Sequence, residues 1–279
     1  MRAKKRLYRI FLYIAIVIIC LISVFPYLWM ILVSLKEKVL VYQPEVWFFR
    51  PSFDNYMKIF KSYDLGTYMI NSAIVAACNC LISLFFGSLT AYGLSRFRFR
   101  SNQLISFLLL FIRILPAVAS VIPAFVIASM LRVIDTHAVL IVVYLLFNIP
   151  FTVLMMRGFF DEISIEIEEA GKIDGCSSIQ VLRKIVIPLS IPGIVATAIF
   201  CIINAWNEFL YAMLLTTFRS STTPTIVQMC KTVTGIIWGE MSAVGAVAYR
   251  NSFQALMIQN IAVATIPGMD SGITIFLRT

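Results

Sequence analysis

Long stretches with few or no charged residues limit what this chain can fold into. Each is long enough to cross the roughly 30 Å hydrocarbon core of a bilayer as a helix. The five clearest run from Ile10 to Val33, Leu65 to Ser95, Ser101 to Leu131, Thr136 to Met156 and Ile185 to Phe218. Hydrophobic residues make up 60% of the chain and charged residues only 13%, about half the charged share of soluble proteins. The sequence therefore predicts an all-α integral membrane protein.

A sixth transmembrane helix is predicted between Met241 and Pro267, where the apolar character is weaker. The polar residues that interrupt it, each costly in hydrocarbon, are Arg250, Asn251, Gln254, Gln259 and Asn260. On this count the chain divides into two parts. Residues 1–64 hold a cytoplasmic N-terminal segment, the first transmembrane helix and an external loop, and residues 65–279 hold the rest of the membrane core.

Basic residues lie in short groups at the ends of the apolar segments, as the positive-inside rule describes. The formal net charge of +9 therefore indicates membrane orientation and not a nucleic-acid partner. A multi-pass cell-membrane protein with a cytoplasmic N-terminus is predicted by the cluster Arg2, Lys4, Lys5, Arg6 and Arg9. The first external loop argues mildly against this orientation, because it also carries basic residues: Lys36, Lys38, Arg50, Lys58 and Lys61.

The connection between the fourth and fifth apolar segments contains an acidic stretch with two glycines, EEAGKIDGC, from Glu168 to Cys176. In the predicted topology it faces the cytoplasm. Isoleucines alternate with other residues at positions 163, 165 and 167, as in an exposed strand, but a lone strand would have no partner. Spacings of four, three and three favour a short helix with one apolar stripe, formed by Ile163, Ile167, Ala170 and Ile173.

A turn is expected at Asp174 and Gly175, which are typical turn residues. Ser177 or Ser178 is then expected to cap a second short helix, which Pro188 would end. Two such helices form a compact knob whose apolar stripe suits a partner's groove. A hairpin lying on lipid is the alternative, but its acidic face would be repelled by an anionic inner leaflet. The sequence thus favours a protein partner.

This stretch resembles the EAA loop of permease subunits of ATP-binding-cassette importers, which has E-A-A, then D-G, then P-L. The matching residues are Glu169-Ala170-Gly171, Asp174-Gly175, Ile187-Pro188-Leu189 and Pro192. Further segments resemble the MalG-type permeases of carbohydrate importers: Asn71-Ser72, Ala91-Tyr92-Gly93-Leu94-Ser95-Arg96-Phe97, Arg157-Gly158-Phe159-Phe160 and Ala205-Trp206-Asn207-Glu208-Phe209. The resemblance covers roughly Pro51 to Glu240, whereas the sequence after Ala248 departs from that family's apolar last span.

The resemblance implies a type I importer permease fold with six transmembrane helices and the EAA loop at about residues 161–192. The loop would be the coupling helix that docks in a cleft of the cytoplasmic ATPase subunit. Its coupling residues would be Glu169, Ala170, Gly171, Asp174 and Gly175. The implied partners are a second, MalF-like permease, an ATPase dimer, an extracytoplasmic sugar-binding protein and the lipid of a bacterial inner membrane. The implied cargo is a sugar whose identity stays open.

The sequence predicts neither catalysis nor a cofactor in this chain. No G-x-x-x-x-G-K-[ST] loop occurs, so ATP is expected to be used by the partner ATPase subunit. The sole histidine, His137, is interpreted as an exposed loop residue, since it lacks co-ligands for a metal. The six cysteines are scattered through mostly apolar sequence and are interpreted as packing residues, so no metal site is expected.

Two charged residues, Arg113 and Glu208, fall inside predicted spans and are functional candidates for that reason. Spacings of three, one and three place a polar face on the fifth span, formed by Asn204, Asn207, Glu208 and Tyr211. This face would line a translocation pathway, in which amides and carboxylates bind sugar hydroxyls and Trp206 and Tyr211 stack on the ring. Polar residues also hold membrane helices together, and this alternative is equally well supported.

Two other classes of function remain open from the residues alone. An ion-gradient-driven secondary carrier would need a buried ionisable relay, for which the spans offer only Arg113 and Glu208. A non-transporting membrane anchor would keep its function after loss of the polar face between Trp206 and Tyr211. The resemblance favours the importer permease over both.

Overall fold

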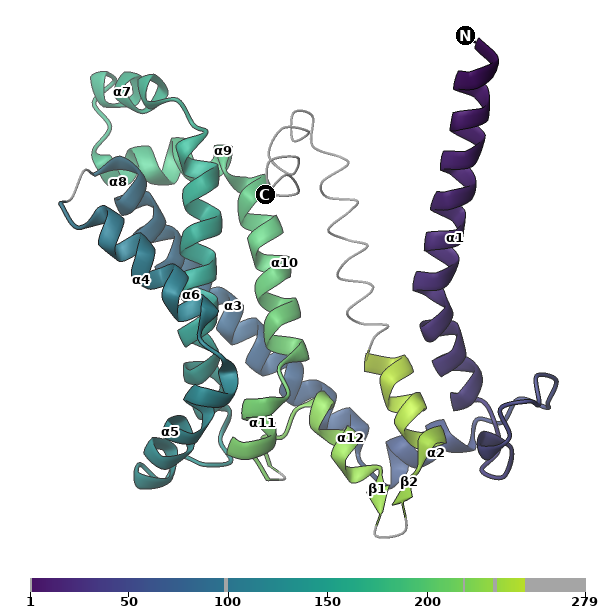
Figure 1. The fold of residues 1–279 in the computed structure, drawn as a ribbon. Helices are drawn as coiled ribbons and strands as arrows, with labels where there is room; N and C mark the ends of the chain where they lie inside the picture. The colour runs from purple at the N-terminus through teal and green to yellow at the C-terminus, as the bar shows by residue number, and fades with distance from the viewer. Residues whose placement is uncertain (1, 98–99, 218, 233–234, 249–279) are drawn as a thin grey trace. The chain divides into compact units, whose positions relative to one another are not determined.

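The computed structural model describes residues 2–97, 100–217, 219–232 and 235–248, and Figure 1 draws it as a ribbon. The described chain forms two compact units, residues 2–66 with 226–248 and residues 67–225. Most of the predicted sixth span, residues 249–267, lies outside the described residues. The predicted division of the chain at residue 64 follows membrane topology and stays a prediction.

Helices form nearly all of the regular structure. The α-helices are α1 (Arg2–Ser34), α2 (Asp54–Lys61), α3 (Leu65–Arg96), α4 (Asn102–Ile114), α5 (Ala117–Met130), α6 (His137–Asp161), α7 (Ile165–Ile173), α8 (Ser178–Val181), α9 (Ile187–Leu189), α10 (Ile191–Asn207), α11 (Leu210–Leu215), α12 (Ile226–Met229) and a last helix over residues 238–248. The shorter elements are the 3-10 turns η1 (Leu40–Tyr42) and η3 (Thr223–Thr225), the π-helical turn η2 (Leu182–Val186), and the strands β1 (Lys231–Thr232) and β2 (Gly235–Ile236). The two strands pair antiparallel.

Three of the described helices, α1, α3 and α6, are long and apolar enough to cross a membrane without a break. Two further candidate spans are bent helix pairs. The axis turns by 90° between α4 and α5. It turns by 76° between the helical segment Ser178–Leu189, which ends with α9, and the following helix α10. The apolar segments 101–131 and 185–218 were predicted as spans, and the structure builds each of them from a bent helix pair.

Proline explains both bends. Leu115 precedes Pro116 and has extended backbone angles, φ −56° and ψ 127°, because the proline ring disfavours the helical conformation of the residue before it. Pro192 lies in the first turn of α10, where its missing N–H and its ring prevent an unbroken helix from continuing out of α9. The chain accordingly leaves the helix at Ser190.

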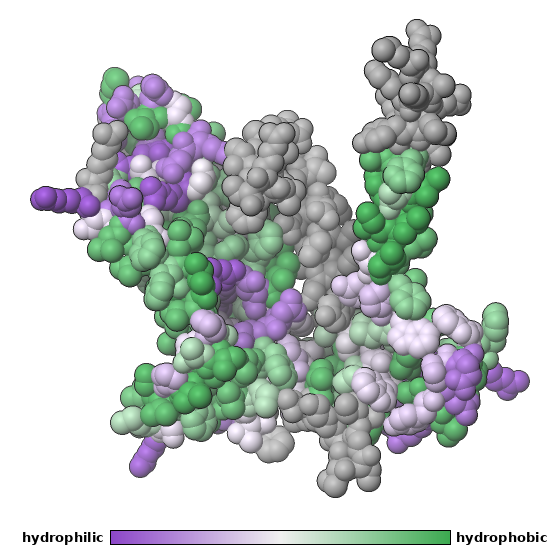
Figure 2. All heavy atoms as spheres, in the orientation of Figure 1, coloured by the Kyte–Doolittle hydropathy of each residue, from purple (hydrophilic) through white to green (hydrophobic). Residues whose placement is uncertain are grey.

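In the first unit, α1 is followed by an ordered loop that carries η1 and α2. The Asn55 side chain is buried and donates from Nδ2 to the carbonyl oxygens of Ser34 and Lys36, both at 2.9 Å. These bonds fix α2 against the C-terminal end of α1. Figure 2 shows a mostly hydrophobic surface over the coloured part of α1, and only 6% of its apolar segment Phe11–Ser34 is buried, so this segment offers its sides to lipid or to another membrane protein.

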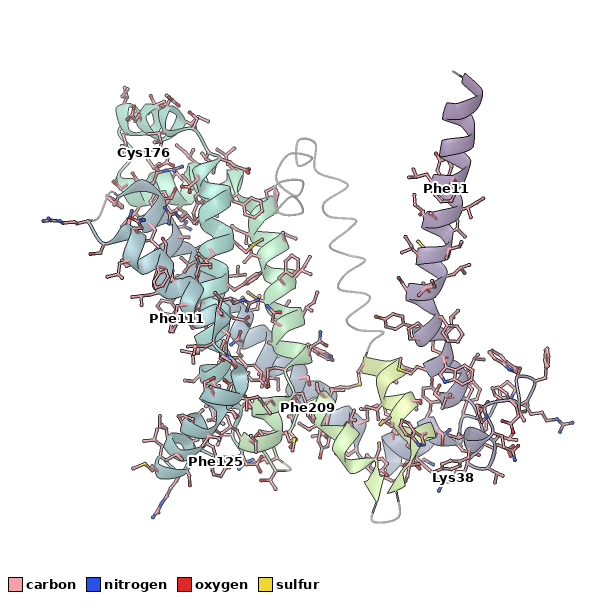
Figure 3. All side chains as sticks on the ribbon, in the orientation of Figure 1. Phe11, Lys38, Phe111, Phe125, Cys176 and Phe209 are labelled. Atoms are coloured by element: carbon pink, nitrogen blue, oxygen red, sulfur yellow. The ribbon has the colours of Figure 1, made fainter. Side chains whose placement is uncertain are left out.

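In the second unit, α3, α6 and α10 are joined by polar side chains within the spans. Asn148 on α6 donates to Asn79 Oδ1 on α3 at 2.6 Å and to the Cys201 carbonyl on α10 at 3.3 Å. Such bonds hold helices together where the hydrophobic effect between helix and lipid is weak. Apolar aromatic residues face outward instead, with Phe111 on α4 52% exposed and Phe125 on α5 41% exposed (Figure 3).

Candidate functional site

The acidic stretch folds as the predicted knob of two short helices. The first, α7, has Ser164 at its N-cap position without a side-chain cap hydrogen bond, and the second, α8, is capped by the side chain of Ser177. Ser177 forms a capping box with Gln180, because its hydroxyl accepts from the Gln180 N–H while the Gln180 side chain accepts from the Ser177 N–H at 2.8 Å. The sequence prediction of a helix at this place and of a serine cap for the second helix is confirmed.

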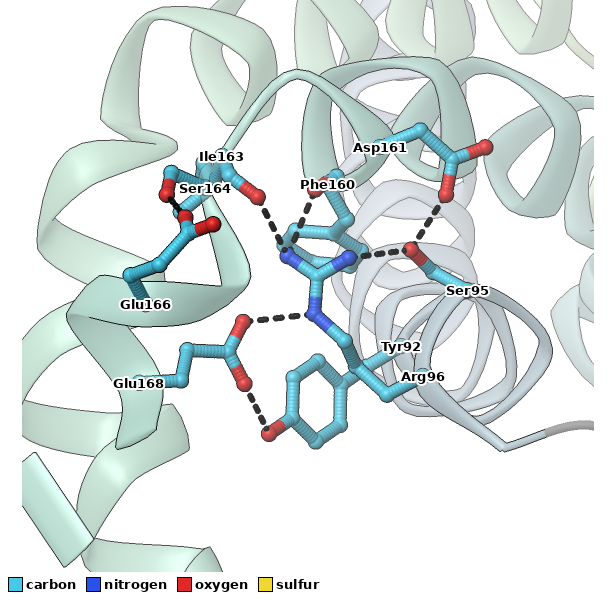
Figure 4. A network of polar contacts seen from close by, with 9 residues as sticks. All are labelled: Tyr92, Ser95, Arg96, Phe160, Asp161, Ile163, Ser164, Glu166 and Glu168. Atoms are coloured by element: carbon cyan, nitrogen blue, oxygen red, sulfur yellow. Dashed lines mark hydrogen bonds and ion pairs between the residues drawn. The ribbon is translucent and has the colours of Figure 1, made fainter. Parts of the chain in front are cut away.

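Glu168 on α7 is the residue that fixes the knob to the membrane helices (Figure 4). Its carboxylate is buried and accepts from Arg96 Nε at 2.6 Å and from the Tyr92 hydroxyl at 2.9 Å. Arg96 and Tyr92 lie four residues apart on α3, so both reach the carboxylate from one face of that helix. A buried charge is stable only when it is paired and hydrogen-bonded, and Glu168 meets both conditions.

Arg96 extends the same network to the end of α6. Its Nη2 donates to the Phe160 carbonyl at 2.7 Å and to the Ile163 carbonyl at 3.0 Å. Its Nη1 donates to Ser95 Oγ at 2.8 Å, and Ser95 in turn donates to Asp161. One guanidinium therefore joins three segments, which are the end of α3, the end of α6 and the knob (Figure 4). Its planar fork of donors makes this possible.

The D-G pair ends α7 in a Schellman motif. Gly175 has φ +86°, a left-handed conformation that costs a residue with a Cβ atom about 1–2 kcal/mol. The Gly175 N–H donates to the Lys172 carbonyl, and the Cys176 N–H donates to the Gly171 carbonyl, both at 3.0 Å. This pattern satisfies the last carbonyl groups of the helix and reverses the chain toward α8.

Gly171 marks the closest approach between α7 and the turn η2. A Cβ atom at this position would overlap Cδ1 of Ile185. Gly171 is buried, whereas the other predicted coupling residues, Glu169, Ala170, Asp174 and Gly175, are exposed. Gly171 thus sets the spacing inside the knob, and the other four lie on its outer surface. Their role in coupling stays a prediction.

The outer surface of the knob is apolar as well as acidic. Ile167 is 46% exposed and Ile173 is 86% exposed, and Ile179 on α8 is 78% exposed. Ile163, the first member of the predicted stripe, is instead half-buried against an internal apolar cluster around Phe160 and Val181. The predicted stripe is therefore shorter than expected, but α8 adds to it.

The predicted polar face on the fifth span is not one continuous helix face. The helix α10 ends at Asn207, and Glu208 takes extended angles, φ −69° and ψ 123°. Its carboxylate accepts from the N–H groups of Leu210, Tyr211 and Ala212 at 3.1–3.4 Å and so caps α11. The prediction of continuous helical spacing through this region is wrong, because the carboxylate binds backbone donors that an unbroken helix would have used.

The four predicted pathway residues therefore occupy different surroundings. Tyr211 is buried on α11 and shares a hydrogen bond of 2.6 Å with the Ser120 hydroxyl on α5. Asn204 is half-buried, and its Nδ2 atom is buried without a hydrogen-bond partner in the described structure. Asn207 is exposed at the end of α10. Pathway lining by these residues stays a prediction.

Asp135, beside His137, organises the loops at the other end of the second unit. Its carboxylate accepts from the N–H groups of Thr217, Arg219 and Ser220 at 3.1–3.2 Å. Partial burial would raise the pKa of Asp135, but these hydrogen bonds outweigh it and lower the pKa to about 2. His137 begins α6 and is half-buried, with Nε2 2.8 Å from Asn71 Oδ1, so its interpretation as an exposed loop residue is wrong.

Among the residues that the structure describes, no three histidine, cysteine or acidic side chains lie close enough together to hold a metal ion. The described cysteines are free thiols. Sequence analysis missed the roles of Glu168 and Arg96. A signal was present, because Tyr92 and Arg96 are spaced by one helical turn in the A-Y-G-L-S-R-F segment that carries the resemblance. The partner of Arg96, however, lies 72 residues away in the sequence.

Comparison with known proteins places these features in a family. The model of the binding-protein-dependent transport system inner membrane component matches residues 83–268. A probable ABC transporter permease protein, y4oR of Sinorhizobium fredii, is 35% identical over 83% of both chains. The sulfoquinovosyl glycerol transport system permease SmoH of Agrobacterium fabrum is 32% identical, covering 83% of this chain and 82% of its own. The trehalose/maltose permease MalG of Thermococcus litoralis is 30% identical, covering 88% and 90%.

The fold matches a solved transporter as well. A chain of a bacterial ABC transporter involved in the import of the acidic polysaccharide alginate superposes with a TM-score of 0.75. The match covers 91% of this chain and 96% of that one at 22% sequence identity. At this level of identity the likeness concerns the fold alone.

Proposed function

The chain belongs to the family of binding-protein-dependent transport system inner membrane components, and from this membership we propose its place in a complete importer. It is the transmembrane permease subunit of an ATP-binding-cassette importer. With a second, MalF-like permease it encloses an alternating-access route across the bacterial inner membrane, and its N-terminus is cytoplasmic. The cargo is a carbohydrate that an extracytoplasmic binding protein delivers.

The observation that carries the coupling part of this proposal is the Arg96–Glu168 attachment of the knob. The 2.6 Å ion pair and the two Arg96 bonds to the end of α6 make α7 rigid with respect to α3 and α6. A force applied to the outer surface of the knob is therefore passed to two membrane helices. The exposed surface combines isoleucines with Glu169, which suits a groove of a partner protein better than an anionic lipid surface.

The ATPase dimer is the partner that this surface would fit. The chain has no phosphate-binding loop, so ATP is bound and hydrolysed by that dimer, and this chain carries no cofactor and no catalytic activity of its own. In this proposal Glu169, Ala170, Asp174 and Gly175 form the docking surface, and Gly171 sets the distance between α7 and η2.

The carbohydrate cargo is supported by relatives that are named as trehalose/maltose and sulfoquinovosyl glycerol permeases. The side chains at the break between α10 and α11 suit such a cargo, because Asn207 is exposed and Asn204 keeps an unpaired amide donor. Amides and aromatic rings are what a hydroxyl-rich ligand needs for hydrogen bonds and stacking. An ion-gradient-driven carrier and a membrane anchor are the alternatives that the following experiment separates.

The test is co-purification of the complex from membranes, followed by an assay of ATP hydrolysis. Glu169→Lys reverses a charge on the exposed surface of the knob, and Gly175→Pro cannot adopt φ +86°. For both variants we expect one of two results. Either the amount of co-purified ATPase subunit falls at least tenfold, or the ATP hydrolysis that the binding protein stimulates falls at least tenfold. Arg219→Gln, an exposed side chain far from the knob in sequence, is the control and should behave as the native chain.

Two results would oppose the proposal. If the native chain never retains an ATPase subunit, a carrier or an anchor becomes the better hypothesis. If Glu169→Lys and Gly175→Pro assemble and hydrolyse ATP at the native rate while transport continues, the knob is not the coupling element, although the family assignment would stand.

A further inference from the structure

Arg113 is a charged side chain on α4 to which the described residues give no counter-charge. It lies in the last turn of α4 and is exposed. Among the described residues, no carboxylate lies within 4 Å of its guanidinium, and none of its N–H groups has a hydrogen-bond acceptor. A cation in the hydrocarbon region is costly unless something neutralises it, so an anion from outside this chain is expected.

The position of Arg113 along α4 argues against lipid headgroups as that anion. Asn102, the first residue of α4, donates to the carbonyls of Leu94 and Phe97, so α4 starts at the same end of the unit as the knob. At 1.5 Å per residue, the 11 residues from Asn102 to Arg113 span about 16 Å. For a helix close to the membrane normal this is about half of a 30 Å hydrocarbon core, a depth at which lipid headgroups are not the nearest anions.

Two aromatic rings lie at the same depth next to Arg113. Its guanidinium carbon is 4.8 Å from the centroid of Phe151 on α6, and Phe151 packs against Phe200 on α10 with centroids 5.9 Å apart. Phe151 lies 10 residues before the end of α6 and Phe200 lies 9 residues after the start of α10, which is about 14 to 15 Å from the knob end of each helix. Three helices thus place a cation and two rings at one level.

Asn204 continues this strip toward the opposite face of the membrane. It follows Phe200 by four residues, which places it one turn further on the same face of α10. Its Nδ2 atom is buried and has no partner in the described structure. An unsatisfied buried amide is destabilising, so a ligand that accepts its hydrogen bond would be favoured. The strip therefore offers a cation, two rings and an unused donor.

We propose that Arg113, Phe151, Phe200 and Asn204 form a cargo subsite at the middle of the membrane for a saccharide that carries an acidic group. The aromatic rings contact the apolar face of a sugar, the amide donates to an oxygen, and the guanidinium pairs with a carboxylate, phosphate or sulfonate. A carboxylate of the second permease would neutralise Arg113 equally well, but it would not use the rings or the Asn204 amide. The inference rests on the proposed function and narrows its cargo to anionic carbohydrates.

The test uses the complete importer, with both permeases, the ATPase dimer and the binding protein, in proteoliposomes. The probes are matched neutral and anionic pairs, galactobiose with digalacturonate and trehalose with trehalose 6-phosphate. The native complex is expected to accumulate an anionic member in an ATP-dependent way. Arg113→Gln should lower that uptake at least tenfold with all subunits retained, Arg113→Lys should restore part of it, and the control Arg219→Gln should leave it unchanged.

The outcomes separate the inference from the proposed function. Uptake of neutral members alone overturns the anionic cargo and leaves the carbohydrate importer standing. Loss of the second permease from the Arg113→Gln complex assigns the guanidinium to a contact between subunits and also overturns the subsite. If no saccharide of either class accumulates although the binding protein stimulates ATP hydrolysis, the carbohydrate cargo itself is refuted, and the subsite with it.

Discussion

Arg96 Nε lies 2.6 Å from Glu168 Oε1, and the two side chains are 10% and 3% exposed. The pair joins α3 to the knob across 72 residues of sequence. Desolvating two charges is costly, and the attraction between them repays that cost only when their other hydrogen bonds are also made. Here the Tyr92 hydroxyl donates a further hydrogen bond to the carboxylate, and the carbonyls of Phe160 and Ile163 accept further hydrogen bonds from the guanidinium.

Removing Glu168 should destabilise the permease itself. Glu168→Ala leaves the Arg96 guanidinium buried without its counter-charge, which costs about 3–5 kcal/mol in comparable pairs. We expect a lower Tm of the detergent-solubilised chain and faster proteolysis of residues 161–177. Glu169→Ala changes the neighbouring exposed carboxylate and should leave Tm unchanged while weakening ATPase docking. Equal Tm losses in the two variants would show that Glu168 has no special structural role.

A methyl group at Gly87 should separate α3 from α6. A Cβ atom there would lie 2.5 Å from Cγ2 and 2.7 Å from Cβ of Thr152, a β-branched side chain that cannot turn away from it. Overpacking of this kind costs about 1–3 kcal/mol, so Gly87→Ala should lower the Tm of the solubilised chain. Gly93→Ala on the same helix meets nothing within 4 Å and is the matched control, expected to be neutral or slightly stabilising. A neutral Gly87→Ala would contradict the close packing.

The positions of the spans and the knob could be predicted from the sequence because their signals are local. Long apolar runs give the spans α1, α3 and α6. Ser177 gives the N-terminal cap of α8, and Asp174 and Gly175 give the C-terminal end of α7. Each of these features depends on residues within one or two helical turns. The Schellman motif at Gly175 is an example, since its hydrogen bonds join residues 171–176.

The breaks and the pairings could not be predicted in the same way. Pro116 and Pro192 were visible in the sequence, but proline also occurs inside unbroken helices of this chain, such as Pro150 in α6. Whether a proline bends a membrane helix depends on which groups satisfy the freed carbonyl. The Arg96–Glu168 pair and the Glu208 cap likewise depend on where the side chains lie in the tertiary structure. The residues next to them in the sequence do not specify those positions.

Glu208 should be needed for the folding of α11. Its carboxylate accepts from three consecutive N–H groups, and loss of such a cap costs about 1–2 kcal/mol. Glu208→Ala should increase amide hydrogen exchange at residues 210–212, and Glu208→Gln, which keeps one carbonyl oxygen, should give a smaller increase. If transport falls in Glu208→Gln while exchange stays native, Glu208 acts on the cargo and not only on the helix.

The stability supplied by Asp135 should depend on pH in the acidic range. Its pKa falls from 3.8 to about 2 because the carboxylate accepts backbone hydrogen bonds from residues 217–220. A lowered pKa means that the charged form is favoured in the folded state, so the contribution is complete above pH 3.8 and is lost as the pH falls toward 2. Asp135→Asn should lower Tm at pH 7 by an amount that shrinks below about pH 4.

Asparagine is the matched replacement because Asp135 has φ +59°, and asparagine tolerates this left-handed conformation as well as aspartate does. The comparison therefore isolates the charge and the lost acceptor oxygen from backbone strain. Thermal unfolding of the native chain and Asp135→Asn, each followed from pH 7 down to pH 3, measures the difference directly. A difference in Tm that stays constant through this range would mean that the Asp135 carboxylate is not bound by the N–H groups of Thr217, Arg219 and Ser220 in the folded protein.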